Sequence, residues 1–222
     1  IREAGGKVLE GDYVRAERML KPVPFPAALP TPPKLSTLET MGGAFEGKVE
    51  GAKFYRPPIN VNFGEAGPNH VGVHQEPCNG CGDCVTGCNV AAKNTLLMNY
   101  LPDARNHGAR IFTEVSVRWI ERRSKGWLVR CELLGLGREA FGAPTFDLEA
   151  EIVVLGAGTL GSTEILLRSR EKGLPLSDRL GRGFTGNGDV LAFAYNCDQE
   201  VRGVGLGSRD PKGKEVGPCI TG

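Results

Sequence analysis

One segment constrains the fold of this chain more than any other, namely residues 152–161 (IVVLGAGTLG). Its first four residues are all apolar, which is typical of a strand buried on both faces. A turn with the spacing G-x-G-x-x-G follows, and a helix is expected from near Ser162 to Lys172, where basic residues precede Gly173. Strand, glycine turn and helix in this order predict an α/β fold with some α+β character, rather than a helical bundle or a β-sandwich.

The residues before this segment predict a β-meander. Apolar and polar residues alternate over 111–119 and again over 127–133, with Ser124, Lys125 and Gly126 as the turn between them. A third short strand is expected near 145–148. Further upstream the patterns predict helices at 9–20, 35–45 and 93–106. The connector at 22–33 is expected to be irregular because of its prolines.

The glycine turn, Gly156-Ala157-Gly158, has three open interpretations. Small residues let a backbone approach a phosphate or a ring, and the N-terminus of the following helix offers free N–H groups. A primary NAD or FAD pyrophosphate loop also needs a second strand that ends in an acidic residue about 20 residues on. Residues 174–179 (LPLSDR) are turn-like instead. The turn is therefore a primary dinucleotide loop, a secondary turn that contacts a flavin, or a turn whose glycines only allow close packing.

Four closely spaced cysteines form a second motif, C-x₂-C-x₂-C-x₃-C, with the spacing of bacterial ferredoxins. Thiolates favour iron–sulfur centres or zinc. Asn89 replaces the usual proline after the motif, and no second motif exists, so a [4Fe–4S] cluster would need an outside ligand such as Cys131, Cys197 or Cys219. Structural zinc and unliganded or disulfide-paired cysteines are the alternatives. The candidate metal ligands are Cys78, Cys81, Cys84 and Cys88.

Charge and hydropathy exclude some classes of partner. Lys and Arg number 27 against 26 Asp and Glu, so no global field attracts nucleic acid or an anionic membrane. No apolar run approaches the roughly 20 residues of a transmembrane helix. The chain starts at Ile1 and ends without a helix stop or a targeting tetrapeptide, so we expect an interior piece of a longer protein.

The order of these elements resembles the glucose–methanol–choline (GMC) oxidoreductases, and within them the cholesterol-oxidase-like bacterial branch. The resemblance rests on residues 92–117 (AKNTLLMNYLPDARNHGARIFTEVSV), on the meander, on 151–170 (EIVVLGAGTLGSTEILLRSR) and on 180–189 (LGRGFTGNGD). It implies part of a glutathione-reductase-like FAD-binding fold, followed by the start of a substrate domain. The implied division is linking helices and connector at 1–76, partial FAD-binding domain at 77–180 and substrate domain from 181 to 222.

The resemblance also implies roles for particular residues. The backbone of Val115 would lie near the adenine of FAD, and Gly156, Ala157 and Gly158 would pass near the pyrophosphate or ribityl chain. The segment 186–189 (GNGD) would mark the crossing toward the substrate side. The family's catalytic histidine lies near the C-terminal end of its chain. The histidines of this chain are His70, His74 and His107, and all of them precede the meander. We therefore assign no catalytic residue.

The implied activity is oxidation of CH–OH groups of alcohols, with sterols among the candidates, by hydride transfer to FAD. The substrate would be a small molecule, and the electron acceptor, oxygen or a redox partner, stays open. One alternative is an iron–sulfur or zinc module for electron transfer or scaffolding, built on the cysteines from 78 to 88. Another is a NAD-dependent enzyme that uses the turn at 156–161 as its main site.

From these expectations, residues 1–222 expressed alone should retain little FAD and oxidise no alcohol. A flavin site needs a phosphate loop to hold the pyrophosphate, and hydride transfer needs a positioned base. Retained flavin and turnover, measured after incubation with excess FAD, check this expectation. A yellow, stoichiometric and active preparation would contradict it.

Overall fold

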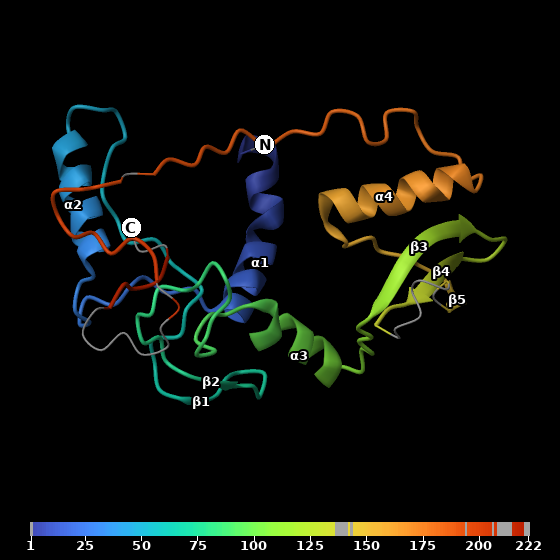
Figure 1. The fold of residues 1–222 in the computed structure, drawn as a ribbon, viewed down its shortest axis with the longest axis horizontal. Coiled ribbons are helices and arrows are strands. Elements are labelled where there is room, and N and C mark those ends of the chain that lie inside the picture. The colour runs from blue at the N-terminus through green and yellow to red at the C-terminus, as the bar shows by residue number, and fades with distance from the viewer. Residues whose placement is uncertain are drawn as a thin grey trace. The chain divides into compact units, whose positions relative to one another are not determined.

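A computed structural model describes residues 2–135, 142, 144–193, 195–205, 207 and 215–219, with side chains described from Leu9 onward. The chain divides into two compact units (Figure 1). The first unit comprises the described residues up to Arg110 together with those from Tyr195 onward, and the second runs from Ile111 to Phe193. Helices and sheet occur together, which agrees with the predicted α/β class.

The first unit consists of short helices and loops. Its loops are held by backbone hydrogen bonds between distant segments, since Val23 and Ile59 exchange a pair at 3.0 and 2.9 Å. Another such bond, of 2.8 Å, runs from the N–H of Asn62 to the carbonyl of Ala92. The elements are α1 (Arg2–Leu20), α2 (Pro33–Phe45), β1 (Gly67–Pro68), β2 (His74–Gln75), the 3₁₀ helix η1 (Leu96–Met98) and α3 (Tyr100–Asn106).

Two of the predicted helices differ in length from those observed. α1 begins well before the predicted residue 9. The helix predicted at 93–106 is wrong in its first half, because α3 begins only at Tyr100. The side chain of Asn99 accepts a hydrogen bond of 2.7 Å from the Tyr100 N–H and so starts the helix there. Pro102 then falls in the first turn, where its missing N–H leaves no hydrogen bond unmade.

The second unit contains the predicted β-meander, which is confirmed. Strands β3 (Val115–Arg122), β4 (Trp127–Leu133) and β5 (Thr145–Ala150) form an antiparallel sheet in that order. β3 begins at Val115 rather than at the predicted residue 111, because Val115 pairs with Leu133, the last residue of β4. Glu114, just before it, has φ of +56°, which is incompatible with an extended strand.

A β-bulge shifts the predicted alternation within β3. The register changes between Val117 and Trp119, so that Arg118 is an extra residue and no residue of β4 stands opposite its backbone. After the bulge Ile120 is buried, whereas the ring of Trp119 lies 5.5 Å from the guanidinium of Arg130. Strict alternation over 111–119 predicts that every second residue lies on the same face of the strand. Because of the bulge, this prediction is wrong beyond Val117.

The predicted buried strand at 152–155 is also wrong. These residues form no strand, and Ile152 and Val154 are 81% and 87% exposed. A strand needs a neighbour for its backbone hydrogen bonds. Within the described residues the sheet ends at β5, and none of the other segments pairs with 152–155. The apolar side chains consequently lack the cover that their pattern predicted.

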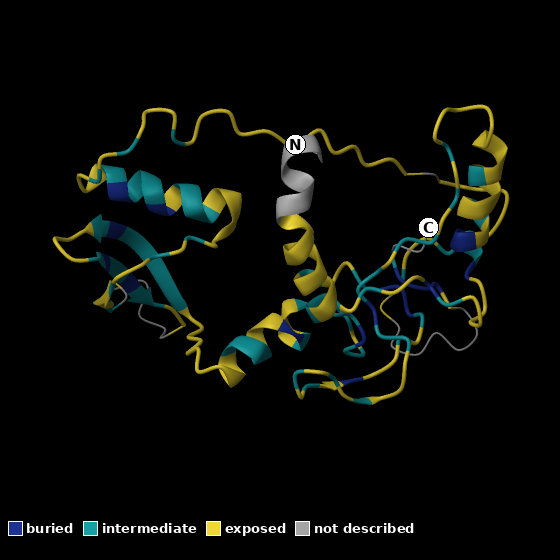
Figure 2. Cartoon of the chain, turned by 180° about the vertical axis from the view of Figure 1, so that it is seen from behind, coloured by how far each residue is buried: buried dark blue, intermediate teal, exposed yellow. Residues whose placement is uncertain are grey.

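Helix α4 (Gly158–Glu171) packs on the open edge of β3. The hydroxyl of Ser169, which is fully buried, accepts the Ile120 N–H at 2.9 Å and donates to the Ile165 carbonyl at 2.7 Å. Ile165 is buried on the same face of the helix. Figure 2 shows buried positions on β3, β4 and α4. Ser169 thus satisfies an edge N–H that would otherwise lack a partner.

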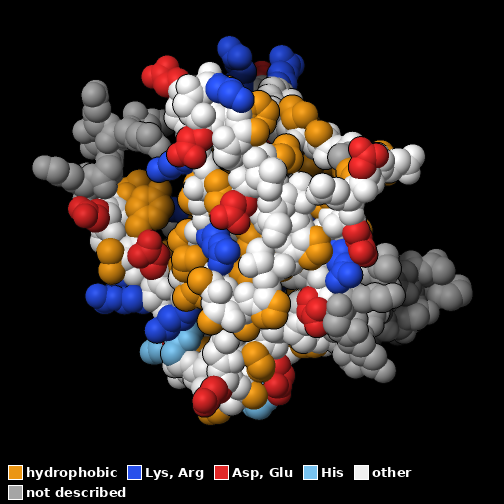
Figure 3. Space-filling view, turned by 90° about the vertical axis from the view of Figure 1, so that its left-hand side faces the viewer, with side chains coloured by type: hydrophobic (Ala, Val, Ile, Leu, Met, Phe, Trp, Pro, Cys, Tyr) orange, Lys and Arg blue, Asp and Glu red, His pale blue; other side chains and the backbone are white. Residues whose placement is uncertain are grey.

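Acidic and basic side chains intermingle on the molecular face drawn in Figure 3, as the balanced composition leads one to expect. Among the residues that the structure describes, none of the helices combines the length and the apolar character needed to cross a membrane.

We expect Ser169→Ala to lower the free energy of unfolding by about 1–3 kcal/mol, because it leaves the buried Ile120 N–H without an acceptor. Denaturant unfolding of the wild type and the variant measures the difference. Ser124→Ala is the matched control, since Ser124 is exposed in the turn between β3 and β4, and its change should stay within about 0.5 kcal/mol. Equal stabilities of the two variants would disprove the role of Ser169.

Candidate functional site

A cavity of about 420 Å³ lies in the second unit, where β3, the segment before α4 and α4 itself meet. Its walls are mostly apolar, with charged groups contributed by β3 and α4. The packing of α4 on β3 positions both walls, since the Ser169 hydroxyl fixes the helix at one strand residue. The lining residues are Val115, Ser116, Val117, Arg118, Val129, Val153, Val154, Leu155, Gly156, Ala157, Gly161, Glu164, Ile165 and Arg168.

The N-terminus of α4 opens next to this cavity without a side-chain cap. Its N-cap residue is Ala157, whose own N–H donates to the Ser162 hydroxyl at 3.1 Å. Gly158, the first helical residue, has φ of +74°, a conformation that other residues adopt only with strain. A Cβ at Gly156 or Gly158 would meet no atom within 4 Å, so the space beside the turn is open. Such a helix start suits an anionic group or a planar ring.

The charged residues of the cavity are Arg118, Glu164 and Arg168. Arg118 pairs with Glu132 at 3.3 Å, and Arg168 pairs with Glu164 one turn earlier on α4. Arg168 also donates from Nη1 to the Arg118 carbonyl at 3.5 Å, a contact that links helix and bulge. Because each guanidinium carries five donors, both arginines keep N–H groups for a further acceptor.

The structure brings together three of the four predicted cofactor residues. Val115 lines one cavity together with Gly156 and Ala157, although more than 40 positions separate it from them in the sequence. Gly158 adjoins the cavity as the first residue of α4. Their role in binding a cofactor stays a prediction. Sequence reasoning missed Arg118 and Arg168. The alternation over 111–119 makes Arg118 a polar residue of a strand, and Arg168 is one of the basic residues expected at the end of the helix before Gly173. Only the bulge in β3 and the packing of α4 place them at the cavity.

The cysteine motif lies in a loop of the first unit, and the sulfurs of Cys78 and Cys88 accept hydrogen bonds from the backbone. Cys78 Sγ accepts the Gly80 N–H at 3.4 Å, and Cys88 Sγ accepts the Ala92 N–H at 3.2 Å. In the described part of the chain, no three His, Cys, Asp or Glu side chains lie so that they could hold a metal ion. Ligation of a [4Fe–4S] cluster or zinc by Cys78, Cys81, Cys84 and Cys88 therefore stays a prediction without support from this geometry.

Burial shifts the pKa values of three groups at this loop, namely Cys78, Cys84 and Lys34. It raises the pKa of the Cys78 thiol to about 11, and it raises the pKa of Cys84, which neighbours Cys219. Burial lowers the pKa of Lys34, whose ammonium lies close to these sulfurs. The thiol form is consequently favoured at Cys78 at neutral pH.

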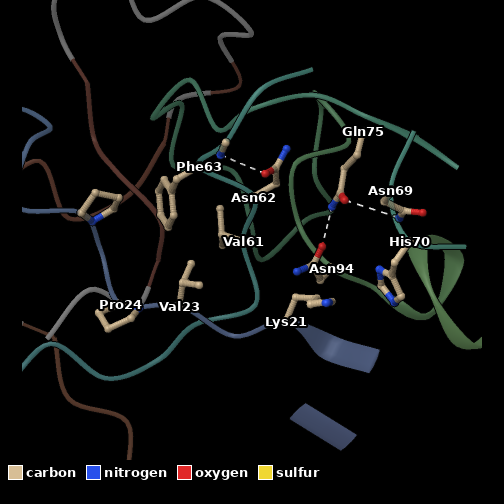
Figure 4. A pocket seen from close by; sticks show the side chains of 12 residues that line it. Lys21, Val23, Pro24, Val61, Asn62, Phe63, Asn69, His70, Gln75 and Asn94 are labelled. Atoms are coloured by element: carbon tan, nitrogen blue, oxygen red, sulfur yellow. Dashed lines mark hydrogen bonds between the residues drawn. The ribbon is translucent and has the colours of Figure 1, made fainter. Parts of the chain in front are cut away.

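A further cavity in the first unit, of about 510 Å³, is apolar at one end and polar at the other (Figure 4). Its polar end is a chain of amides, in which Asn69 donates to Gln75 at 3.5 Å and Gln75 donates to Asn94. Asn69 and Asn94 also donate to backbone carbonyls, at 2.6 and 2.8 Å, so this chain ties loops together. We assign no ligand to it. The labelled lining residues are Lys21, Val23, Pro24, Val61, Asn62, Phe63, Asn69, His70, Gln75 and Asn94.

Comparison with known proteins places the chain among flavin enzymes. A family profile described as GMC oxidoreductase matches residues 62–185. Two proteins named cholesterol oxidase, from Mycobacterium tuberculosis strains CDC 1551 and H37Rv, are each 44% identical over 124 residues, which is 54% of this chain and 20% of theirs. A cholesterol oxidase of Acinetobacter baumannii is 30% identical over 210 residues, or 88% of this chain and 38% of that protein.

The chain therefore spans between 20% and 38% of the length of these relatives. No solved structure was found to match it.

The half-buried thiol of Cys78 gives a testable expectation. A pKa of about 11 leaves roughly a hundredfold less thiolate at pH 8 than an ordinary thiol carries, and the thiolate is the reactive form. Iodoacetamide at pH 8 should therefore label Cys78 at least about tenfold more slowly than the exposed Cys197. Peptide mass spectrometry over time measures both rates, and unfolding in urea should abolish the difference. Equal rates in the folded protein would contradict the assigned burial.

Proposed function

This chain belongs to the GMC oxidoreductase family, and on that premise we propose that it forms part of the FAD site of an oxidoreductase that acts on CH–OH groups. The observation that carries the proposal is the cavity at the start of α4. Val115 from β3 and the turn Gly156-Ala157 line it together, and these are the residues for which the family resemblance implies contact with FAD.

The residues present fit such a group. FAD combines an apolar aromatic adenine with an anionic pyrophosphate. The cavity offers Val115, Val117 and Val129 as apolar walls, and an uncapped helix start for negative charge. Arg118 and Arg168, each paired with a glutamate, keep N–H donors for a further anionic group at its edge. Glycine at 156 and 158 leaves room for close approach of the cofactor to the backbone.

When bound, FAD would accept a hydride from the carbon that carries the substrate hydroxyl. The part assigned to this chain is binding and orientation. The Val115 backbone would lie near adenine, and the turn at 156–158 would lie near the pyrophosphate or ribityl chain. We further propose that residues 77–180 are a partial FAD-binding domain and that residues 181–222 begin a substrate domain. No residue of this chain is assigned to proton transfer from the substrate hydroxyl.

A sterol is the substrate class that the relatives favour, since all three are named cholesterol oxidase. Because the chain spans less than two fifths of their length, substrate and electron acceptor are proposals for the protein that contains it. Oxidation rates of the intact protein on a sterol, a long-chain primary alcohol and methanol would rank the substrate classes. Faster turnover of methanol than of the sterol would count against this choice.

A visible spectrum of the intact protein tests the cofactor. Bound flavin gives two resolved bands, an iron–sulfur centre gives a broad brown shoulder, and a NAD-dependent enzyme gives neither. We expect the flavin bands. The electron-transfer alternative predicts the shoulder without flavin, and its cysteine loop lacks a metal-binding arrangement among the described residues.

Gly156→Val should weaken FAD binding at least about tenfold, or about 1.4 kcal/mol of binding free energy, because the added side chain fills space reserved for the cofactor. Fluorescence titration with FAD of the intact protein, freed of its cofactor, measures the affinity. Gly43→Val is the matched control, since Gly43 is exposed and a Cβ there would likewise meet no atom within 4 Å. If both variants bind FAD as the wild type does, the turn does not contact the cofactor.

A further inference from the structure

The C-terminal segment of the first unit binds directly to the cysteine loop. The N–H groups of Val216 and Gly217 both donate to the Gly80 carbonyl, at 2.8 and 2.9 Å. Val216 is buried against Gly82. A side chain at position 82 would collide with Val216, and Gly82 has φ of +81°. Glycine is therefore required in the loop for this segment to dock. Docking brings Cys219, distant in sequence, to the loop.

Cys219 lies beside one particular cysteine of the loop, Cys84. Cys84 interacts with both the backbone and the thiol of Cys219, and the two cysteines line the same cavity. Cys219 Sγ further contacts the Gly82 carbonyl at 3.5 Å. Both cysteines are free thiols. Because they are already neighbours, a sulfur–sulfur bond between them requires no distant segments to be brought together.

A cavity of about 530 Å³ gives small molecules access to this pair. Cys84 and Cys219 both line it, and its other walls are largely apolar, including Pro57, Ile59 and Val85. Lys93 also lines the cavity, and its ammonium donates to the Cys84 carbonyl at 3.1 Å. The thiols are thus half-buried in the protein yet open to a compact reagent.

A buried cation lies on the same cluster. Lys34 is only 6% exposed, and its ammonium donates to the Gly217 carbonyl at 3.1 Å, two residues before Cys219. It interacts electrostatically with the sulfurs of Cys219, Cys84 and Cys78.

From these contacts we propose that Cys84 and Cys219 form a redox-active dithiol, which closes to a disulfide by exchange with a low-molecular-weight disulfide. One of the two sulfurs loses its proton to water and attacks the reagent, forming a mixed disulfide and releasing one small thiolate. The other sulfur loses its proton and attacks the protein-side sulfur, releasing the second small thiolate. Two cysteine thiols are oxidised and one small disulfide is reduced to two thiols.

The bond would fasten the C-terminal segment covalently to the cysteine loop. Without it, this attachment depends on the two hydrogen bonds to Gly80, the contact of Val216 with Gly82 and the Lys34 bond to Gly217. The proposal does not depend on flavin binding, because every residue that it uses belongs to the first unit.

The test is disulfide mapping of the intact protein after incubation with mixtures of reduced and oxidised glutathione. We expect one dominant link between Cys84 and Cys219, located by tandem mass spectrometry of unreduced peptides and reversed by dithiothreitol. Cys84→Ser and Cys219→Ser should each abolish the link, whereas Cys197→Ser, at an exposed cysteine, should leave it unchanged.

Three results would overturn the proposal. In the first, Cys84 pairs mainly with Cys78, Cys81 or Cys88. In the second, the wild-type protein forms no link at any glutathione ratio although free-thiol counting shows that both cysteines are reduced. In the third, metal analysis of the purified protein finds stoichiometric zinc or iron whose removal is needed before Cys84 reacts. Because the wild-type map alone decides among these outcomes, a variant that fails to fold does not obscure the result.

Discussion

The packing of α4 on the edge of β3 is the interaction on which the second unit depends. A three-stranded sheet leaves the backbone groups of its outer strands unpaired, and the buried hydroxyl of Ser169 satisfies one of them at Ile120. The opposite end of the same helix carries the glycine turn, where Gly156 and Ala157 line one cavity with Val115. The packing of α4 on β3 therefore serves both the stability of the unit and the formation of its cavity.

The first unit is built on a different principle. It has few regular elements, and polar side chains and backbone bonds between loops replace a continuous sheet. Asn69, Gln75 and Asn94 tie the hairpin of β1 and β2 to residues 94–98 and to the end of α1, and the C-terminal segment docks on the cysteine loop through Gly80. Loops packed in this way can carry reactive groups such as Cys84, because the backbone around them is fixed by its own hydrogen bonds.

The two proposed functions rest on separate observations. Flavin contact rests on a cavity in the second unit and on family membership, and the dithiol rests on contacts within the first unit. The exposed apolar residues at 152–155 belong with the first proposal. Ile152 and Val154 have the apolar pattern of a sheet interior, and they stand directly before the glycine turn that lines this cavity.

The sequence by itself determined the meander, the glycine turn before α4 and the family, because alternation, turn residues and motif order are local properties. It also indicated Val115 and the turn at 156–158 as residues of one site. Only the tertiary structure decided that Arg118 and Arg168 reach the same cavity, since a bulge shifts the strand and helix packing orients the second arginine. It likewise decided that Cys219 meets Cys84, because the contact joins residues 135 positions apart (219 minus 84) and depends on how the chain returns to the loop.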